Sequence, residues 1–332
     1  MRALHAYAQH DPSRMVVEDV PLPTLGPDDV LVRVHASGVS PGELDWNGTW
    51  LRDDGTRRKP PIIPGHELSG VVEKVGAGAT GIEVGDEVFG VIDFRRDGAD
   101  ADFVAARADE LVPKPATATH AEAAAVPLSA LTAWQALFDQ GDLGPGHRVL
   151  VHGGGGGVGS FAVQLARWRG AHVTATSSAR DADLVHGLGA DDVIDYRTQR
   201  FEDAVADMDL VFDTVGGDTW ERSWDVLGPH GRLVSIAVPR PPERATDEGR
   251  RAIWFIVKQD REQLLEIAGL IDAGHLRPIV SAELPLIRGQ EAYGQTGIRS
   301  GPGKVVLLVA GVSGTDAEAS SSQHGRSAAV VT

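Results

Sequence analysis

The sequence predicts an α/β protein that combines a doubly wound parallel sheet domain with a second, β-rich and partly barrel-like domain. Between about residues 126 and 277, short apolar strand patterns alternate with helical patterns, which is typical of a parallel sheet covered by helices. The first 125 residues instead contain short β-type runs separated by Gly and Pro, with little helical periodicity. A chain of 332 residues is long enough for two such cores.

The β-rich domain is expected to use both ends of the chain. Its predicted strands are 30–34, 70–75, 87–92 and 103–105, and strand patterns return at 279–286 and 304–309. We therefore expect residues 1–125 and 278–312 to form one domain around the parallel-sheet domain at 126–277. Residues 313–332 are rich in Ser, Ala and Gly and are predicted to be a disordered tail.

The parallel-sheet domain should contain five strands, and a helical pattern precedes or follows each of them. The strands are predicted at 149–151, 173–176, 193–194, 210–213 and 233–236. The helices are predicted at 121–126, 129–139, 158–168, 181–188, 201–206, 218–227 and 261–273.

A glycine-rich turn between the first of these strands and its helix carries the strongest functional signal. Residues 152–159 read His-Gly-Gly-Gly-Gly-Gly-Val-Gly. Gly153, Gly156 and Gly159 fall on the dinucleotide-binding spacing, with Gly157 and Val158 between them, so phosphates would lie at the helix N-terminus. A glycine-rich turn in an ordinary loop is the alternative.

The end of the second strand favours NADP(H) over NAD(H). An NAD site usually has an acidic residue there, whereas this strand ends in Ser177 and Ser178, followed by Arg180. Hydroxyls and a guanidinium suit a 2′-phosphate, and Tyr196 at the end of the next strand is a further candidate contact. The alternative is that the two serines cap the following helix.

Composition excludes several classes of function. The formal net charge of −16 argues against nucleic acids and anionic membranes as partners. The sequence has no cysteine, which excludes disulfides, thiol nucleophiles and thiolate-bound metals. No apolar run reaches the ~20 residues of a membrane helix. Residues 1–10 lack a secretory signal pattern, so a cytoplasmic location is expected.

Several segments together resemble one superfamily. They are residues 64–72 (PGHELSGVV), 131–137 (LTAWQAL), the glycine turn, 188–191 (LGAD) and 211–217 (VFDTVGG), in that order. Over roughly residues 1–310 the chain resembles the medium-chain dehydrogenases/reductases, in their zinc-independent quinone oxidoreductase (zeta-crystallin-like) branch. The resemblance implies a GroES-like β-barrel domain beside a Rossmann domain, an active site in the cleft between them, and a homodimer.

The same resemblance bears on zinc. Ser40 stands near the position where the zinc-dependent branch has a cysteine, His66 and Glu67 are kept, and residues 126–128 offer no further ligand. A catalytic zinc needs three protein ligands, so no metal is expected. We expect His66 and Glu67 to form a hydrogen-bonded pair in the cleft wall, the alternative being a buried structural histidine.

Candidate cleft residues also follow from the resemblance. Ser40 and Thr132 would contact substrate or nicotinamide, although Ser40 replaces an asparagine common in relatives. The alternative for Ser40 is a role in a turn. The alternative for Thr132 is a hydroxyl bonded within its own helix. Trp46 and Trp50 would stack on a flat substrate or serve as packing anchors. The remaining predicted cleft residues are Glu43, His66 and Asp93. Asp93 lies in a charged loop, and the alternative is that this loop is simply solvated.

Further cofactor contacts are expected at the carboxyl ends of the later strands. They are Val215, Gly216, Ile236 and Ala237. Phe255 and Val257 would line the nicotinamide pocket, and their segment also resembles an edge strand used for dimer pairing.

These features predict an NADPH-dependent oxidoreductase that transfers hydride to a quinone or an α,β-unsaturated carbonyl (enone). Such a reaction needs a hydrogen-bond donor for the substrate oxygen but no metal. Two alternatives remain open: a trans-acting enoyl reductase or tailoring enzyme of a larger metabolite, and a non-catalytic NADPH-binding protein.

Overall fold

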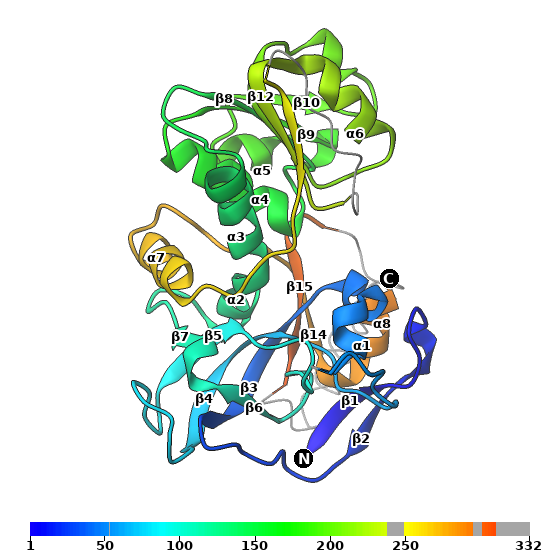
Figure 1. The fold of residues 1–332 in the computed structure, drawn as a ribbon, viewed down its shortest axis with the longest axis vertical. Coiled ribbons are helices and arrows are strands. Elements are labelled where there is room, and N and C mark those ends of the chain that lie inside the picture. Colours follow the sequence, from blue (N-terminus) through cyan, green and yellow to red (C-terminus); the bar gives the residue numbers. More distant parts are fainter. Residues whose placement is uncertain (53, 238–248, 295–300, 310–332) are drawn as a thin grey trace, which may run out of the picture.

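The computed structural model describes residues 1–52, 54–237, 249–294 and 301–309. The chain forms two domains stacked along the long axis of the molecule (Figure 1). One contains a six-stranded parallel sheet and the other a seven-stranded sheet with a separate two-stranded ribbon. The predicted disordered tail lies outside the described residues.

The β-rich, GroES-like domain is closed by β15 (Lys304–Leu308), the last strand within the described residues. Its strands are β1 (Arg2–Ala6), β2 (Met15–Asp19), β3 (Asp29–Val39), β4 (Glu67–Val75), β5 (Glu87–Val91), β6 (Phe103–Arg107), β7 (Leu111–Pro113), β14 (Val280–Pro285) and β15 (Lys304–Leu308), and its short helices are α1 (Asn47–Trp50) and α8 (Gly289–Gly294). The sheet order is β14-β15-β3-β4-β5-β7, with β6 also on β3. β15 runs antiparallel to β3, so both ends of the chain share one sheet.

The Rossmann domain has the strand order β10-β9-β8-β11-β12-β13, with parallel pairs throughout. Its strands are β8 (Arg148–His152), β9 (His172–Ser177), β10 (Asp192–Asp195), β11 (Met208–Asp213), β12 (Leu227–Ser235) and β13 (Arg251–Trp254). Its helices are α4 (Gly157–Trp168), α5 (Ala182–Gly187), α6 (Asp218–Ser223) and α7 (Arg261–Asp272). The strand order reverses at β8, and ligands bind such sheets at this switch point.

Two further helices, α2 (His120–Ala124) and α3 (Pro127–Trp134), link the domains. All eight residues of α3 are buried, because it packs on α4 and also contacts β4 and β5 of the barrel. One apolar core lies around Phe161 and Phe212 and extends to Phe89 and Val112 of the barrel, and another lies around Trp50 and Leu68.

Several elements differ from the prediction. The helix predicted at 129–139 becomes π-helical at Gln135–Gln140, and the one predicted at 201–206 is only a 3-10 turn at Phe201–Asp203. So short and acidic a segment gains little from helix formation. β1, β2, β7 and β13 were not predicted, because each has at most five residues and so gives only a weak strand pattern.

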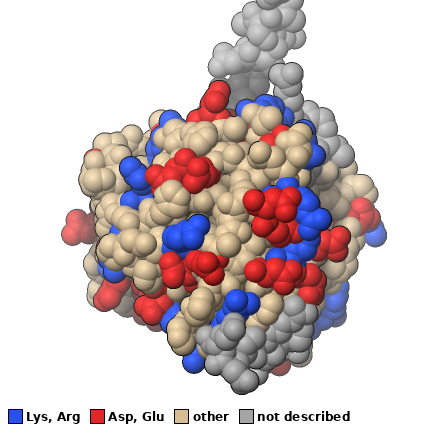
Figure 2. Space-filling view, turned by 90° about the horizontal axis from the view of Figure 1, so that it is seen from above, with Lys and Arg blue, Asp and Glu red and all other residues tan. Residues whose placement is uncertain are grey.

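Charges of both signs share the outer surface of the Rossmann domain. Figure 2 shows this end of the molecule, with Lys and Arg interspersed among Asp and Glu. Within the described residues, no helix combines the length and the apolar character needed to cross a membrane.

Candidate active site

The glycine turn connects β8 to α4 at the switch point of the parallel sheet. Gly153 has φ +75°, a conformation that glycine adopts without strain. A Cβ on Gly159 would lie 2.1 Å from the Gly153 carbonyl oxygen, so the helix can approach the strand only with glycine there. Gly156 is exposed, and a Cβ there would meet only one atom, the Gly153 carbonyl oxygen at 3.3 Å. The outer side of the turn is therefore open.

The first turn of α4 fits a phosphate group. Gly156 is the N-cap and has no side chain to satisfy the first N–H groups, and Gly157 and Val158 are half-buried beside it. Unpaired N–H groups and the helix dipole favour an anion at this point. The geometry thus fits the pyrophosphate of a dinucleotide.

The expected ribose contacts form a network around a carboxylate that sequence reasoning missed. Ser178 Oγ donates to Asp181 at 2.8 Å, and Arg180 Nε donates to the same carboxylate at 3.1 Å. Burial opposes the charge of Asp181, but these hydrogen bonds outweigh it and hold its pKa below the ordinary value. Arg180 remains exposed at 62% of its side chain. Its guanidinium is thus accessible, yet already paired.

Two neighbouring residues differ in their availability to a ligand. Ser177 is buried and its hydroxyl donates to the Ser178 carbonyl, so the expectation that it faces the ribose is wrong in this conformation. Ser178 does not cap the next helix through its side chain either. Tyr196 is 58% exposed, and the Arg197 guanidinium lies 5.6 Å from its ring centre. The exposed cations here are therefore Arg180 and Arg197.

A buried carboxylate organises the ends of β11 and β12. Asp213 accepts hydrogen bonds from the backbone N–H groups of Val215 and Gly216, both at 2.9 Å, and from the Ser235 hydroxyl. Ser235 Oγ in turn accepts from the backbone N–H of Ala237, the residue after Ile236. The predicted contacts at these strand ends thus lie on two turns fixed by one side chain.

The segment of Phe255 and Val257 follows an edge strand rather than forming one. β13 ends at Trp254, so the edge-strand prediction was placed too far along the chain. Phe255 and Val257 pack against the Rossmann core, and Ile256 between them is 69% exposed. Gln135 fixes the segment through hydrogen bonds to both backbone groups of Lys258.

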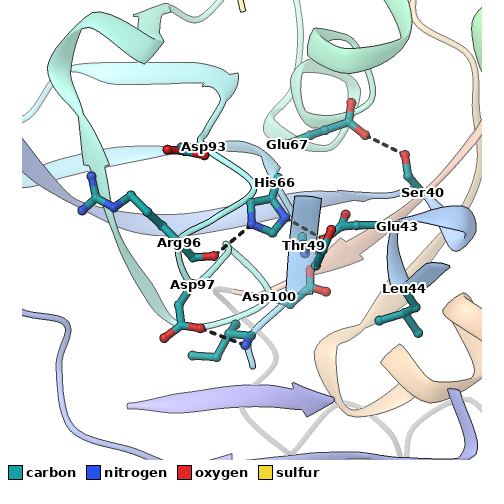
Figure 3. A network of polar contacts seen from close by, with 12 residues as sticks. Ser40, Glu43, Leu44, Thr49, His66, Glu67, Asp93, Arg96, Asp97 and Asp100 are labelled. Carbon is teal, nitrogen blue, oxygen red and sulfur yellow. Dashed lines mark hydrogen bonds and ion pairs between the residues drawn. The ribbon is translucent and has the colours of Figure 1, made fainter. Parts of the chain in front are cut away.

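In the barrel wall, His66 pairs with Glu43 instead of Glu67. His66 Nδ1 lies 2.6 Å from the Glu43 carboxylate and Nε2 lies 3.1 Å from the Arg96 carbonyl oxygen (Figure 3). Both partners accept, so both ring nitrogens carry hydrogens and the ring is cationic. Burial opposes this charge, but Glu43 outweighs it and raises the pKa of His66. The predicted pairing is wrong because Glu43 reaches the ring from the Pro41–Asp45 turn.

Glu67 instead pairs with Lys304, the first residue of β15. Both side chains are almost fully buried. Lys304 Nζ also donates to Ser40 Oγ at 3.0 Å and to Ser129 Oγ at 3.3 Å, and Ser40 Oγ lies 3.3 Å from Glu67. Ser40 and Ser129 thus meet at one ammonium group. Sequence reasoning missed Lys304 and Ser129, although a lone lysine opening the apolar strand KVVLL was a visible signal.

Thr132 and Trp50 are turned away from the cleft. Thr132 Oγ1 donates to the Leu128 carbonyl at 2.6 Å within its own helix, which leaves no hydrogen for a ligand. Trp50 is 1% exposed in the barrel core, and its Nε1 donates to the Leu44 carbonyl. Both predicted roles are therefore corrected: Thr132 satisfies its helix and Trp50 is a packing anchor.

Trp46 and Asp93 remain accessible. Trp46 is 41% exposed and meets Phe94 edge to face, and Phe94 in turn stacks on His66. Asp93 accepts from the Arg95 backbone N–H and borders a cavity of about 330 Å³ between the barrel and the start of α7. Neither Ser40 nor the glycine turn lines this cavity.

The donor set does not fit a catalytic zinc. Both ring nitrogens of His66 are occupied, Glu67 is paired with an ammonium group, and Ser40 replaces the thiolate. No group of three His, Asp or Glu side chains within the described residues is arranged to hold a metal. Zinc ligation here would require breaking two buried ion pairs.

Two family models match the chain. The alcohol dehydrogenase GroES-like domain matches residues 26–128, and a domain described as zinc-binding dehydrogenase matches residues 188–307. The zinc in the second description does not agree with the donor set present here.

Relatives of known description cover most of the chain. The mitochondrial NAD(P)H oxidoreductase RTN4IP1 of Danio rerio is 30% identical, over 85% of this chain and 84% of that protein. The 2-methylene-furan-3-one reductase of Solanum lycopersicum is 32% identical, over 87% of this chain and 74% of that protein. The structure of a quinone oxidoreductase from Coxiella burnetii has a TM-score of 0.82 at 29% identity, covering 93% of this chain and 99% of that one.

The names of several relatives contradict the expected cytoplasmic location, because they are described as mitochondrial or chloroplastic. The lack of a signal pattern at residues 1–10 therefore does not decide the compartment. The fold, the glycine turn and these similarities agree on an oxidoreductase with a nicotinamide cofactor. The chain belongs to the medium-chain dehydrogenase/reductase superfamily, in its quinone oxidoreductase branch.

Proposed function

We propose that the protein is an NADPH-dependent reductase of quinones or enones. The observation that carries the proposal is the junction between the glycine turn and the barrel, which presents a serine hydroxyl backed by an ammonium group instead of a metal donor set. A hydroxyl donor is what a reduction without a metal needs at the substrate oxygen. The enone reductase among the relatives supports the substrate class.

The preference for NADPH rests on the cations at the end of β9 and β10. Arg180 and Arg197 are positioned to neutralise a 2′-phosphate, with Tyr196 as a hydroxyl donor, whereas Ser178 donates to Asp181. A guanidinium binds a phosphate through two parallel hydrogen bonds. Asp181 competes for Arg180, so the phosphate must displace an existing pair.

NADPH, when bound, supplies the hydride. The N-terminus of α4 binds the negative phosphates, and Asp213 holds the turns on which Val215 and Ala237 lie. Ser40 donates a hydrogen bond to the substrate carbonyl oxygen and stabilises the negative charge that develops there. Trp46, half-exposed beside Phe94, offers an apolar ring face to a flat substrate.

The test is the oxidation of NADPH, followed at 340 nm, with a panel of quinones and small enones. We expect turnover with at least one member and weaker activity with NADH. Binding of NADP⁺ without oxidation of NADPH by any member would contradict the proposal and favour a non-catalytic nucleotide-binding role. Turnover restricted to large acyl substrates would favour the enoyl reductase alternative.

We also propose that two copies pair through β13. Within the described sheet β13 lies at the edge and pairs only with β12, which leaves one side of its backbone for another strand. Light scattering should give the mass of a dimer. A monomer at micromolar concentration would contradict this proposal.

A further inference from the structure

Lys304 lies where five distant segments of the chain meet. The residue before it, Gly303, donates its backbone N–H to the Gly155 carbonyl at 2.9 Å, which ties β15 to the glycine turn. A Cβ on Gly157 would lie 3.9 Å from Lys304 Cβ and 3.5 Å from Ser129 Oγ. Lys304 therefore lies next to Gly157, the first residue of α4, beside the proposed phosphate site.

The three protons of the ammonium group are fully assigned. They go to Ser40 Oγ, Ser129 Oγ and the Glu67 carboxylate, and Lys304 is 7% exposed. An ammonium group has no acceptor, so each serine must use an oxygen lone pair for this contact. The hydrogen of each serine therefore points away from Lys304.

Glu67 balances the buried cation. Its second oxygen accepts from the backbone N–H of Leu128, at the start of α3, at 3.0 Å. Burial raises the pKa of Glu67, and the attraction of Lys304 acts against this. The carboxylate therefore bridges Lys304 and the start of α3.

The geometry gives the two serines different directions. Ser40 Oγ has one contact beyond Lys304, a long one of 3.3 Å to Glu67, whose same oxygen already receives Lys304. Its hydrogen can leave that contact for a substrate carbonyl with little loss. Ser129 is buried and its Oγ would lie 3.5 Å from a Cβ on Gly157, so its hydroxyl stands beside the first residue of α4.

We propose that Lys304 is a positioning residue that orients Ser40 toward the substrate and Ser129 toward the cofactor phosphates, and so couples the two subsites. This rests on the proposed function for the substrate side only. Its positive charge also polarises the Ser40 hydroxyl, which strengthens the hydrogen bond to an oxygen that gains negative charge.

The decisive variant is the double substitution Glu67→Gln with Lys304→Met. It removes both charges together, because Lys304→Met alone leaves an unpaired buried carboxylate that can unfold the protein. The control is Glu87→Gln with Lys114→Met. Lys114 is also a buried lysine paired with a glutamate, although Glu87 is exposed, and the pair lies on the barrel away from the glycine turn.

Two measurements are needed: the dissociation constant of NADP⁺ by fluorescence, and kcat and KM at saturating NADPH. We expect Ser129→Ala to weaken NADP⁺ binding several-fold with kcat unchanged, and Ser40→Ala to lower kcat about tenfold or more with NADP⁺ binding unchanged. The Glu67/Lys304 double variant should show both losses and the Glu87/Lys114 variant neither.

Combined substitutions distinguish an effect of Lys304 on the orientation of Ser40 from an effect on packing alone. In the background of the Glu67/Lys304 double variant, Ser40→Ala should lower kcat much less than in the original protein, because the hydroxyl has already lost its direction. Lys304→Arg, which keeps the charge, should retain part of the activity.

Two results would overturn the proposal. One is a Glu67/Lys304 double variant with unchanged NADP⁺ affinity and kcat. The other is a loss matched by the control variant, which would make the pair purely structural. If the original protein reduces no quinone or enone, the proposed function fails, while the NADP⁺ measurements on Ser129→Ala and the double variant still decide the role of Lys304.

Discussion

The two walls of the candidate site are built in different ways. The phosphate wall is made of backbone, from a turn of eight consecutive residues in which Gly153 and Gly159 have conformations or contacts that need glycine. The barrel wall is made of buried polar pairs from distant segments: the ion pairs Glu43–His66 and Glu67–Lys304, and the hydrogen bond from Tyr293 to Asp100. Local geometry thus determines the first wall, and tertiary pairing determines the second.

This difference determines which substitutions each wall tolerates. A turn with no room for a Cβ fails by steric overlap, whatever the chemistry of the new side chain. A wall of buried ions fails when one partner is removed and the other keeps its charge out of water. Substitutions in the two walls should therefore separate cofactor binding from stability.

The largest effect is expected from Gly159→Ala. Its Cβ would lie 2.1 Å from the Gly153 carbonyl oxygen, so the turn must open. We expect NADP⁺ binding to be lost and the free energy of unfolding to fall by roughly 3 kcal/mol. The control is Gly269→Ala, an exposed position within α7 where a Cβ would meet no atom within 4 Å. It should stabilise the protein by up to about 1 kcal/mol, as urea unfolding can measure. An alanine at 159 that binds NADP⁺ normally would refute the steric account.

The next effect concerns the barrel wall. Glu43→Gln leaves the His66 ring without its counter-charge, and we expect a loss of about 3 kcal/mol in the free energy of unfolding. Glu18 provides the control, because it lies 2.6 Å from His5, the same distance as Glu43 from His66, but its side chain is 39% exposed against 2% for Glu43. Glu18→Gln should lose much less than Glu43→Gln, because water screens the exposed pair. Equal losses in the two variants would show that burial does not set the strength of the pair.

The same division explains what could be predicted from the sequence. The glycine spacing, the buried parallel strands and the position of Ser178 and Arg180 depend on neighbouring residues, and these predictions placed the turn and most of the Rossmann domain. The pairing of His66 depends on whether Glu43 or Glu67 reaches the ring, and adjacency in the sequence favoured the wrong one. Lys304 was missed because its partners are distant in the sequence. Glu67 lies 237 residues away, Ser40 lies 264 residues away, and Ser129 lies on α3. Asp181 was missed although it follows Arg180 directly, because only the folded structure shows that its carboxylate accepts from both Arg180 and Ser178.

A pH-dependent effect is expected from Asp100. Burial raises its pKa to about 7, and Tyr293 donates a hydrogen bond to one of its oxygens at 2.8 Å. The folded pKa exceeds the ordinary value of 3.8, so this carboxyl stabilises the fold most below about pH 4 and loses that contribution as the pH rises through 7. Relative to Asp100→Asn, the original protein should therefore lose roughly 2–3 kcal/mol in the free energy of unfolding between pH 5 and pH 8.

Urea unfolding of both proteins at the two pH values checks this. The asparagine variant provides the reference because it shares every other titrating group with the original protein. A difference between the two proteins that stays constant with pH would mean that Asp100 is ionised throughout.

The smallest effect concerns the ribose end of the phosphate wall, where backbone gives way to paired side chains. Arg180 is held by Asp181 at 3.1 Å and must exchange that partner for a 2′-phosphate. Arg180→Ala should raise the KM for NADPH about tenfold and change the KM for NADH little.

Asp181→Asn should act in the opposite direction and lower the KM for NADPH two- to threefold, because it frees the guanidinium and removes a negative charge. Arg288→Ala is the control, since Arg288 is likewise exposed and paired with a nearby acid, Glu291, but lies in the barrel domain. Equal changes in the two KM values for Arg180→Ala would contradict the 2′-phosphate assignment. A higher KM for NADPH in Asp181→Asn would mean instead that Asp181 holds Arg180 in the binding orientation, and that this end of the site, like the barrel wall, depends on an intact ion pair.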